Sequence, residues 1–119
     1  MNASARNARR ILRQRANDTR TTRRAHRNTA TGRPQTARTH LIAAGIPTAD
    51  AQRFAGAFSR SVTPTATTET TIKLKGRTTK RVPVKLYDTA TFAARLATYR
   101  PKDRAAAARF ERAALHLAA

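Results

Sequence analysis

The basic excess of this chain constrains its folding more than any other feature of the sequence. Lysine and arginine supply 25 residues against 6 acidic ones, so the formal net charge at pH 7 is +19. Such a chain attracts polyanions, of which nucleic acid is the commonest. The basic residues are mostly arginine, whose planar guanidinium binds phosphate or guanine in bidentate fashion. GC-rich codon usage also favours arginine, but it does not account for the scarcity of acids.

Composition excludes several classes of protein. The length of 119 residues fits one domain. No run of about 18 apolar residues occurs, so we expect no membrane span, and the basic N-terminus lacks the apolar stretch of a secretory signal. The absence of cysteine excludes disulfides, cysteine-zinc sites and thiol catalysis. These exclusions leave a small, soluble, strongly cationic protein.

The composition changes near residue 40. Residues 1–40 hold 11 arginines, no lysine and one acid, and their only large apolar residues besides Met1 are Ile11 and Leu12. This stretch cannot bury enough apolar surface to offset the entropy of ordering it. We therefore predict two parts, a flexible basic arm over 1–37 and a folded domain over 38–119.

Within the arm, residues 3–16 can form a helix with arginines spread around it, whereas 18–39 reads as flexible. The arginines that we expect on the nucleic-acid backbone are Arg6, Arg9, Arg10, Arg13, Arg15, Arg20, Arg23 and Arg24. A solubilising tail is the alternative, but the charge density favours phosphate contact.

The domain begins with a helix-turn-helix pattern. A short helix over 39–44 ends at Gly45, and a second helix over 49–61 follows with Thr48 as its N-cap. The second helix has one apolar face, formed by Ala51, Phe54, Ala55, Phe58 and Val62. Its other side would present four residues to the major groove of DNA, namely Gln52, Arg53, Ser59 and Arg60.

Residues 70–87 read as a β-hairpin that turns at Gly76, after a threonine-rich loop over 63–71. Apolar and cationic residues alternate, so one face is apolar and the other basic. This pattern fits a wing that reaches phosphates or the minor groove, through Lys73, Lys75, Arg77, Lys80 and Arg81. An ordinary solvated hairpin face is the alternative.

Two helices complete the domain. The first, over 90–100 and capped by Asp88 or Thr89, would pack on the hairpin through Phe92, Leu96 and Tyr99. The last, over 102–117, would bury Phe110, Ala113, Ala114 and Leu117. Its alanine stripe would serve either a homodimer or, as we favour, the cover of a small core.

Signals for catalysis are poor. His26, His40 and His116 do not have metal-ligand spacing, the acids are isolated, and the four glycines form no phosphate-binding loop. We expect no enzymatic activity, no metal and no cofactor.

The order of these elements resembles the winged-helix module of MerR-type regulators and of phage or plasmid excisionases. The resemblance covers about residues 39–100 and includes Gly76-Arg77 at the wing tip and Tyr87-Asp88 before an acid-capped helix. It implies an α+β, mainly α, fold: a winged helix-turn-helix with a two-stranded wing, a basic N-terminal arm and an added C-terminal helix. It also implies that Gln52, Arg53, Ser59 and Arg60 face the groove, while Lys75, Arg77, Lys80 and Arg81 contact DNA from the wing.

We therefore expect a small transcriptional regulator or excisionase-like factor that binds double-stranded DNA sequence-specifically. It would come from a phage, plasmid or other mobile element of a GC-rich bacterium, and would be cytoplasmic and nucleoid-associated. The helix over 49–61 would lie in the major groove, and the wing over 72–86 and the N-terminal arm would contact phosphates. Two alternatives stay open. The arginine-rich arm could bind RNA in a ribonucleoprotein or antitermination complex, or the protein could be a cationic structural component that binds packaged nucleic acid without sequence preference.

Overall fold

The computed structural model describes residues 3–118, and its longest element is a single helix, α1, over Ala3–Ala30. This helix runs well past the predicted 3–16 and takes in most of the stretch predicted as flexible. Threonine hydroxyls within it donate to carbonyls four residues earlier, as Thr22 Oγ1 does to Asp18 at 2.8 Å. The helix thereby satisfies polar side chains that elsewhere compete with the backbone for hydrogen bonds.

The two helices of the predicted helix-turn-helix pattern are present, as α2 over Ala37–Ala43 and α3 over Thr48–Ser59. Gly45, with φ of 100°, ends α2 as the sequence predicts. Its N–H donates to the Ile42 carbonyl at 3.1 Å, and the Ile46 N–H donates to the Leu41 carbonyl at 3.0 Å, which is the Schellman pattern. The prediction of Thr48 as the N-cap of α3 is wrong, because Pro47 occupies that position without a side-chain bond.

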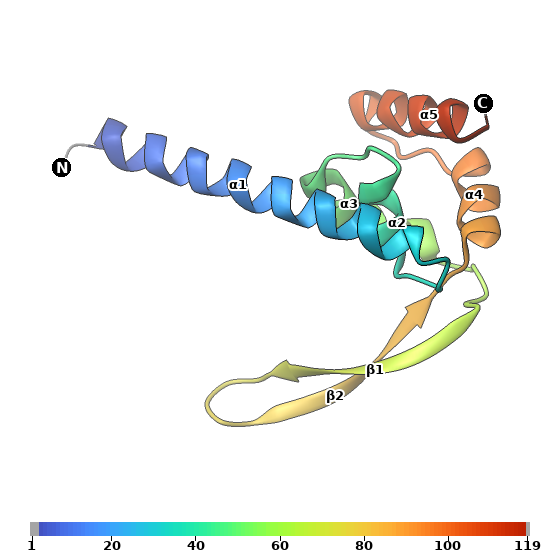
Figure 1. Cartoon of the computed structure of the whole chain (residues 1–119), viewed down its shortest axis with the longest axis horizontal. Coiled ribbons are helices and arrows are strands. Elements are labelled where there is room, and N and C mark those ends of the chain that lie inside the picture. The colour runs from blue at the N-terminus through green and yellow to red at the C-terminus, as the bar shows by residue number, and fades with distance from the viewer. Residues whose placement is uncertain (1–2, 119) are drawn as a thin grey trace.

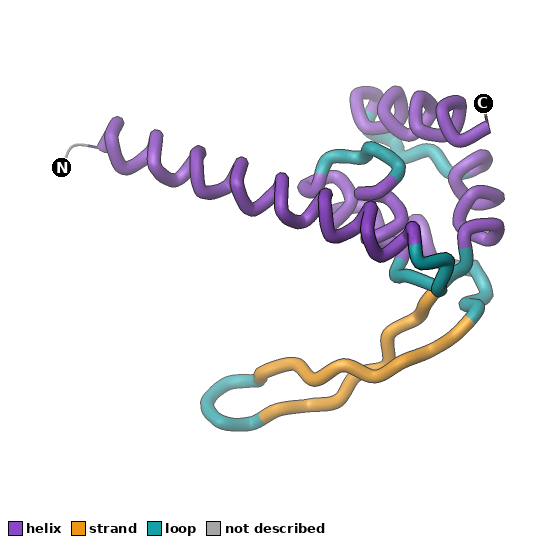
Figure 2. The backbone as a smooth tube through the Cα atoms, viewed as in Figure 1, coloured by secondary structure: helices purple, strands orange, loops and turns teal. Residues whose placement is uncertain are grey.

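The two strands form an antiparallel hairpin, β1 over Ala66–Lys73 and β2 over Thr79–Leu86. β1 begins four residues before the predicted hairpin, within the threonine run that the sequence analysis assigned to a loop. Figure 2 shows that the hairpin extends from the helices and that a loop joins its strands at the far end. Every residue of β1 is exposed, so the hairpin contributes little to the core.

The last helices are α4 over Thr89–Thr98 and α5 over Arg104–Ala118. Asp88 caps α4 as predicted, since its Oδ1 accepts from the Thr91 N–H at 2.7 Å. The prediction that Phe92 and Tyr99 pack on the hairpin is wrong: Phe92 contacts rings in α2 and α3, and Tyr99 contacts rings in α3 and α5. Leu117, predicted as buried, is 38% exposed.

The core lies where the helices meet and is mainly aromatic. The ring of Phe58 lies 5.5 Å from those of Phe92 and Tyr99, and 6.3 Å from that of Phe110, which is fully buried. Ala25 is also buried there, so the end of α1 belongs to the same core. The fold is α+β and mainly helical, and none of the helices within residues 3–118 could cross a bilayer.

Two elements extend from this helical body, and Figure 1 shows that α1 and the β1–β2 hairpin both project to the same side. The radius of gyration is 16.3 Å. A compact chain of this length would have a radius of gyration of about 13.5 Å. The difference reflects the two projections, which carry much of the positive charge.

Candidate nucleic-acid interface

α1 carries nine arginines, and eight of them lie on one face of the helix. At 100° per residue they fall within an arc of about 140°. We call this set the arginine face: Arg6, Arg9, Arg10, Arg13, Arg20, Arg23, Arg24 and Arg27. The prediction that the arginines are spread around the helix is therefore wrong, with Arg15 alone on the other side.

Most of the arginine face points away from the body. The side of α1 that meets the body is formed by its half-buried and buried residues, namely Asp18, Thr21, Thr22, Ala25, Asn28 and Thr29. The centre of the arginine face lies about 130° around the axis from the middle of that side. Arg24, at the edge of the face, lines a hollow between α1 and α2. All eight arginines are exposed, and their guanidinium groups form no ion pair with any carboxylate of residues 3–118. They are therefore available to bind an anion.

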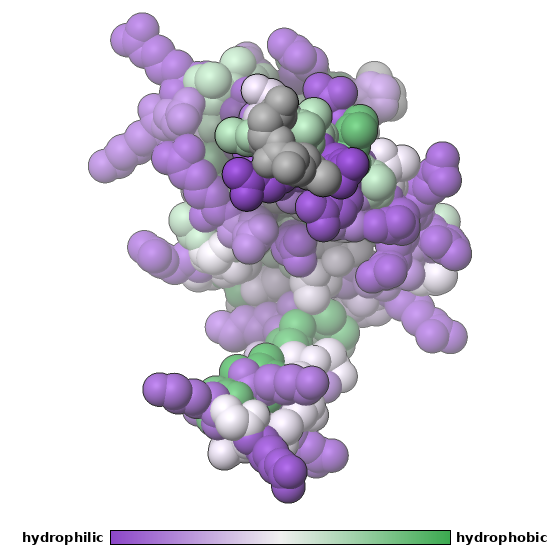
Figure 3. Space-filling view, turned by 90° about the vertical axis from the view of Figure 1, so that its left-hand side faces the viewer, coloured by the Kyte–Doolittle hydropathy of each residue, from purple (hydrophilic) through white to green (hydrophobic). Residues whose placement is uncertain are grey.

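The first half of α1 stands clear of the body. Every residue from 6 to 17 is exposed, and their side-chain hydrogen bonds stay within the helix, as in the bond from Arg10 to Asn7 at 2.8 Å. In Figure 3, which looks along this half of the helix, hydrophilic side chains extend from it on several sides. A partner can therefore approach α1 here without displacing other parts of the chain.

The hairpin also has two different faces. The register pairs Thr70 with Val82 and Thr68 with Val84, so these residues share a face with Ile72, which is 40% exposed. In Figure 3 the hydrophobic side chains of the hairpin lie on the side toward the helical body, and hydrophilic ones surround the rest.

The predicted wing residues are distributed around the hairpin. Lys73 and Arg81 share the other face. Lys80 pairs with Ile72 across the strands and so lies on the same face as the apolar residues, and Lys75 and Arg77 lie in the exposed loop. Arg81 also lies 3.6 Å from the Glu69 carboxylate, but both side chains are largely exposed and such pairs are weak. The hairpin therefore presents cations in several directions.

Side chains of the predicted recognition helix, α3, make more contacts within the protein than the sequence suggests. The Arg53 guanidinium lies 3.4 Å from the Asp103 carboxylate and stacks over the Phe54 ring at 4.7 Å. The Ser59 hydroxyl donates to the Ala55 carbonyl at 2.9 Å. Two of the four predicted side chains therefore already have partners within the body.

The other two predicted residues, Gln52 and Arg60, are exposed and have no side-chain partner within residues 3–118. They lie on the same side of the helix as Gly56, at four-residue spacing. Because Gly56 has no side chain, the helix backbone is exposed between them. At the opposite end of α3, the Arg109 Nε donates to Asp50 Oδ2 at 2.5 Å and ties α5 over the first turn. The open part of α3 is thus the side that carries Gln52 and Gly56, together with Arg60 just beyond the last residue of the helix.

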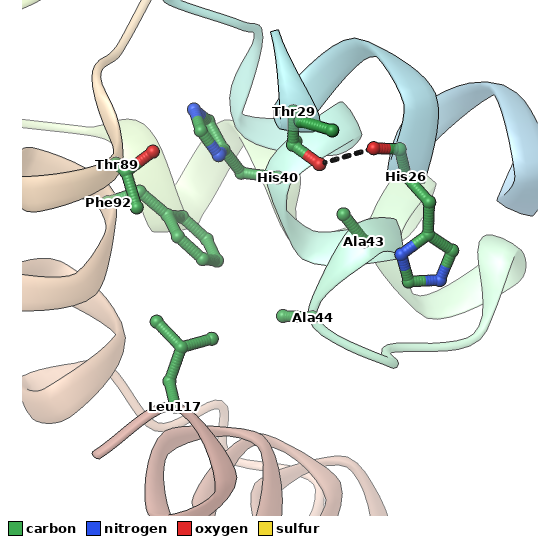
Figure 4. A pocket seen from close by; sticks show the side chains of 9 residues that line it. His26, Thr29, His40, Ala43, Ala44, Thr89, Phe92 and Leu117 are labelled. Atoms are coloured by element: carbon green, nitrogen blue, oxygen red, sulfur yellow. Dashed lines mark hydrogen bonds between the residues drawn. The ribbon is translucent and has the colours of Figure 1, made fainter. Parts of the chain in front are cut away.

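A separate hollow of about 300 Å³ lies between α1, α2, α4 and α5. Figure 4 shows His40 beside Phe92 on one wall and Leu117 of α5 across from them. No lysine or arginine lines this hollow, so it is not part of the cationic surface. Nowhere within residues 3–118 do three histidine or carboxylate side chains come close enough to hold a metal ion.

His40 is nevertheless a buried titratable group. Its Nε2 donates to the Tyr87 carbonyl at 2.7 Å, and its ring stacks on Phe92 at 4.8 Å. Burial lowers the pKa of His40, and this effect outweighs the Tyr87 carbonyl and the Asp88 carboxylate, which favour the protonated ring. The neutral ring therefore acts as a packing residue that joins α2 to the end of the hairpin.

Three exposed cations were missed by the sequence analysis as site residues. Arg27 completes the arginine face, and the recurrence of arginine at three- and four-residue spacing was a signal for it. Arg38 on α2 and Lys85 on β2 both line an open groove at the base of the hairpin. No sequence signal links these two, because 46 residues separate them.

Comparison of the chain with protein-family models, with curated proteins and with solved structures found no match.

Proposed function

We propose that this protein binds double-stranded DNA and acts by binding, not by catalysis. The arginine face of α1 carries the proposal: eight exposed arginines form one surface, directed mostly away from the core and unpaired with any carboxylate of residues 3–118. Phosphates neutralise such a surface and release counterions, which supplies most of the affinity of non-specific binding. The hairpin cations add contacts on the same side of the molecule (Figure 1).

Base contacts in this proposal come from the open side of α3 and from Arg60 just beyond its end, in the manner of a winged helix-turn-helix. Arg60 suits guanine and Gln52 suits adenine, and both side chains are free of other partners within residues 3–118. Arg53 reads bases only if its pair with Asp103 opens. A regulator or excisionase-like role would follow from the sequence that these residues select.

The first test removes three cations from the arginine face. The variant R9Q/R13Q/R20Q is compared with K102Q/R104Q/R112Q. This control loses the same charge from exposed positions just before α5 and within it. If each α1 arginine contacts one phosphate, the slope of log K against log salt should shrink by about 2.7. The α5 variant should keep the wild-type slope, and equal slopes for the two variants would refute the role of α1.

A second test asks whether binding is sequence-specific. Bound duplexes are selected from a random pool at about 150 mM salt, which suppresses non-specific phosphate binding. A sharp motif that R60Q relaxes at one position supports the winged helix-turn-helix. Binding without enrichment supports instead a structural protein that coats nucleic acid.

RNA binding is the second candidate, because the exposed half of α1 is a free arginine-rich helix. Deletion of residues 1–17 separates the two candidates and keeps Ala25 in the core. DNA recognition through α3 predicts weaker binding to the same preferred sequence. RNA recognition through α1 predicts loss of all specific binding.

A further inference from the structure

A groove at the base of the hairpin is separate from the arginine face of α1 and from the hairpin loop. It has a volume of about 360 Å³ and is open to solvent. The residues along it come from the start of α2, the second half of α3 and the end of β2. We call it the basal groove.

The basal groove is cationic. Arg38 of α2 and Lys85 of β2 line it, and both are exposed. Neither forms an ion pair with a carboxylate of residues 3–118, and no acidic residue lines the groove. Two cations from separate elements therefore share a concave surface that nothing in the described chain neutralises.

The groove also exposes backbone. Gly56 lines it, and a Cβ built on this glycine would meet no atom within 4 Å. The same glycine lies on the open stripe of α3 between Gln52 and Arg60. The groove is therefore continuous with the surface that we propose for base contacts.

The two walls of the groove are held in place at Tyr87. The Tyr87 carbonyl accepts from the Gln35 N–H at 2.9 Å and from His40 Nε2 at 2.7 Å, and the Tyr87 N–H donates to the Gln35 carbonyl at 2.8 Å. These bonds join the end of β2 to the segment that begins α2. The backbones that carry Arg38 and Lys85 are thus fixed relative to each other before any ligand arrives, which lowers the entropic cost of binding.

We propose that the basal groove holds one sugar-phosphate strand of a DNA duplex, with Arg38 and Lys85 on its phosphates. The occupant follows from charge complementarity, from the exposure of the groove to solvent and from its continuity with α3. This inference rests on the proposed function and adds to it a clamp point independent of α1. It assigns to the protein a third phosphate contact region, besides α1 and the hairpin loop.

The test uses the full-length protein and a fluorescent DNA duplex of about 20 base pairs, with affinity measured by anisotropy. The variant R38Q/K85Q keeps side-chain length and removes both charges, while R104Q/R112Q removes two exposed charges from α5. At about 0.1 M salt each phosphate contact is worth about 8-fold in affinity, so R38Q/K85Q should bind about 60-fold more weakly. Its salt slope should shrink by about 1.8, whereas the α5 variant should bind within about threefold of wild type.

A second variant, G56E, brings a carboxylate to the groove at a position where an added Cβ meets no atom within 4 Å, and glutamate is a good helix former. It should weaken binding at least tenfold, while G56A, which adds only a methyl group, should bind as wild type does. If wild type binds the duplex and R38Q/K85Q matches the α5 variant, the groove inference is wrong and the proposed function stands. If wild type binds no duplex at about 0.1 M salt, the proposed function and the groove inference are both wrong.

Discussion

Ionic strength should control the helicity of the first half of α1. Arginines on one helix face are neighbours at three- and four-residue spacing, and residues 6–13 contain four such like-charge pairs. Each pair costs about 0.2–0.5 kcal/mol at low salt, so the repulsion amounts to about 1–2 kcal/mol. A free helical segment of this length is marginal in water even without repulsion, so this energy decides whether it forms.

The magnitude of the change follows from the helix bounds. Residues 6–17 are about a sixth of the chain's helical residues. Raising the salt from about 10 mM to about 1 M shortens the screening length from about 30 Å to about 3 Å, which removes the repulsion. Helical ellipticity in far-UV circular dichroism should therefore rise by up to about a fifth, since residues 6–17 would otherwise be partly unwound.

A double variant isolates the cause. R6Q/R13Q removes all four like-charge pairs at once, because every pair includes one of these two arginines. Its ellipticity at low salt should equal that of wild type at high salt, while R104Q/R112Q should respond to salt as wild type does. A wild-type signal that stays flat across the salt range would refute the reasoning, and so would a R6Q/R13Q signal as salt-sensitive as wild type.

Three further predictions concern the body. Phe110→Ala should lower the free energy of unfolding by about 3–5 kcal/mol, because this ring is fully buried, and urea denaturation showing less than about 1 kcal/mol would contradict the aromatic core. Gly45→Ala should destabilise the protein by about 1 kcal/mol because φ is 100°, whereas Gly56→Ala, within a helix, should stabilise it by a similar amount; the same sign for both would count against the Schellman turn. Because burial lowers the pKa of His40, the folded state resists its protonation, so stability is complete above about pH 6.5 and falls as the pH drops below it. Thermal melts between about pH 7.5 and 5 should show this loss in wild type and in H116Q, and should show less of it in His40→Phe.

The parts of the fold that local patterns specify were predicted well. The apolar spacing of α3, the glycine after α2 and the cap at Asp88 each depend on residues close in the chain. The extent of α1 was not predictable in this way. Its second half has few apolar residues and is ordered by packing against α2, with Ala25 as its buried contact.

The candidate site shows the same division. The cations of the arm and of the hairpin are visible in the sequence, and the structure places them on two projections. The engagement of Arg53 depends on Asp103, which lies 50 residues away, so no local pattern reveals it. The basal groove likewise combines residues from three elements, and only the fold brings them together.

The distribution of charge explains how so basic a chain can fold. α1 holds nine arginines and one aspartate, and the hairpin from 66 to 86 holds six cations and one glutamate, so about two thirds of the net charge lies on the projections. Three of the remaining acids act within the body, where Asp50 and Asp103 pair with arginines and Asp88 caps α4. Repulsion is thus kept away from the core, and the stability of the body should depend little on salt.

Amide exchange in α3 and α4 should therefore change little between about 10 mM and 1 M salt, while exchange in residues 6–17 should slow markedly at the higher concentration. Equal salt dependence in both regions would mean that charge repulsion also lowers the stability of the body.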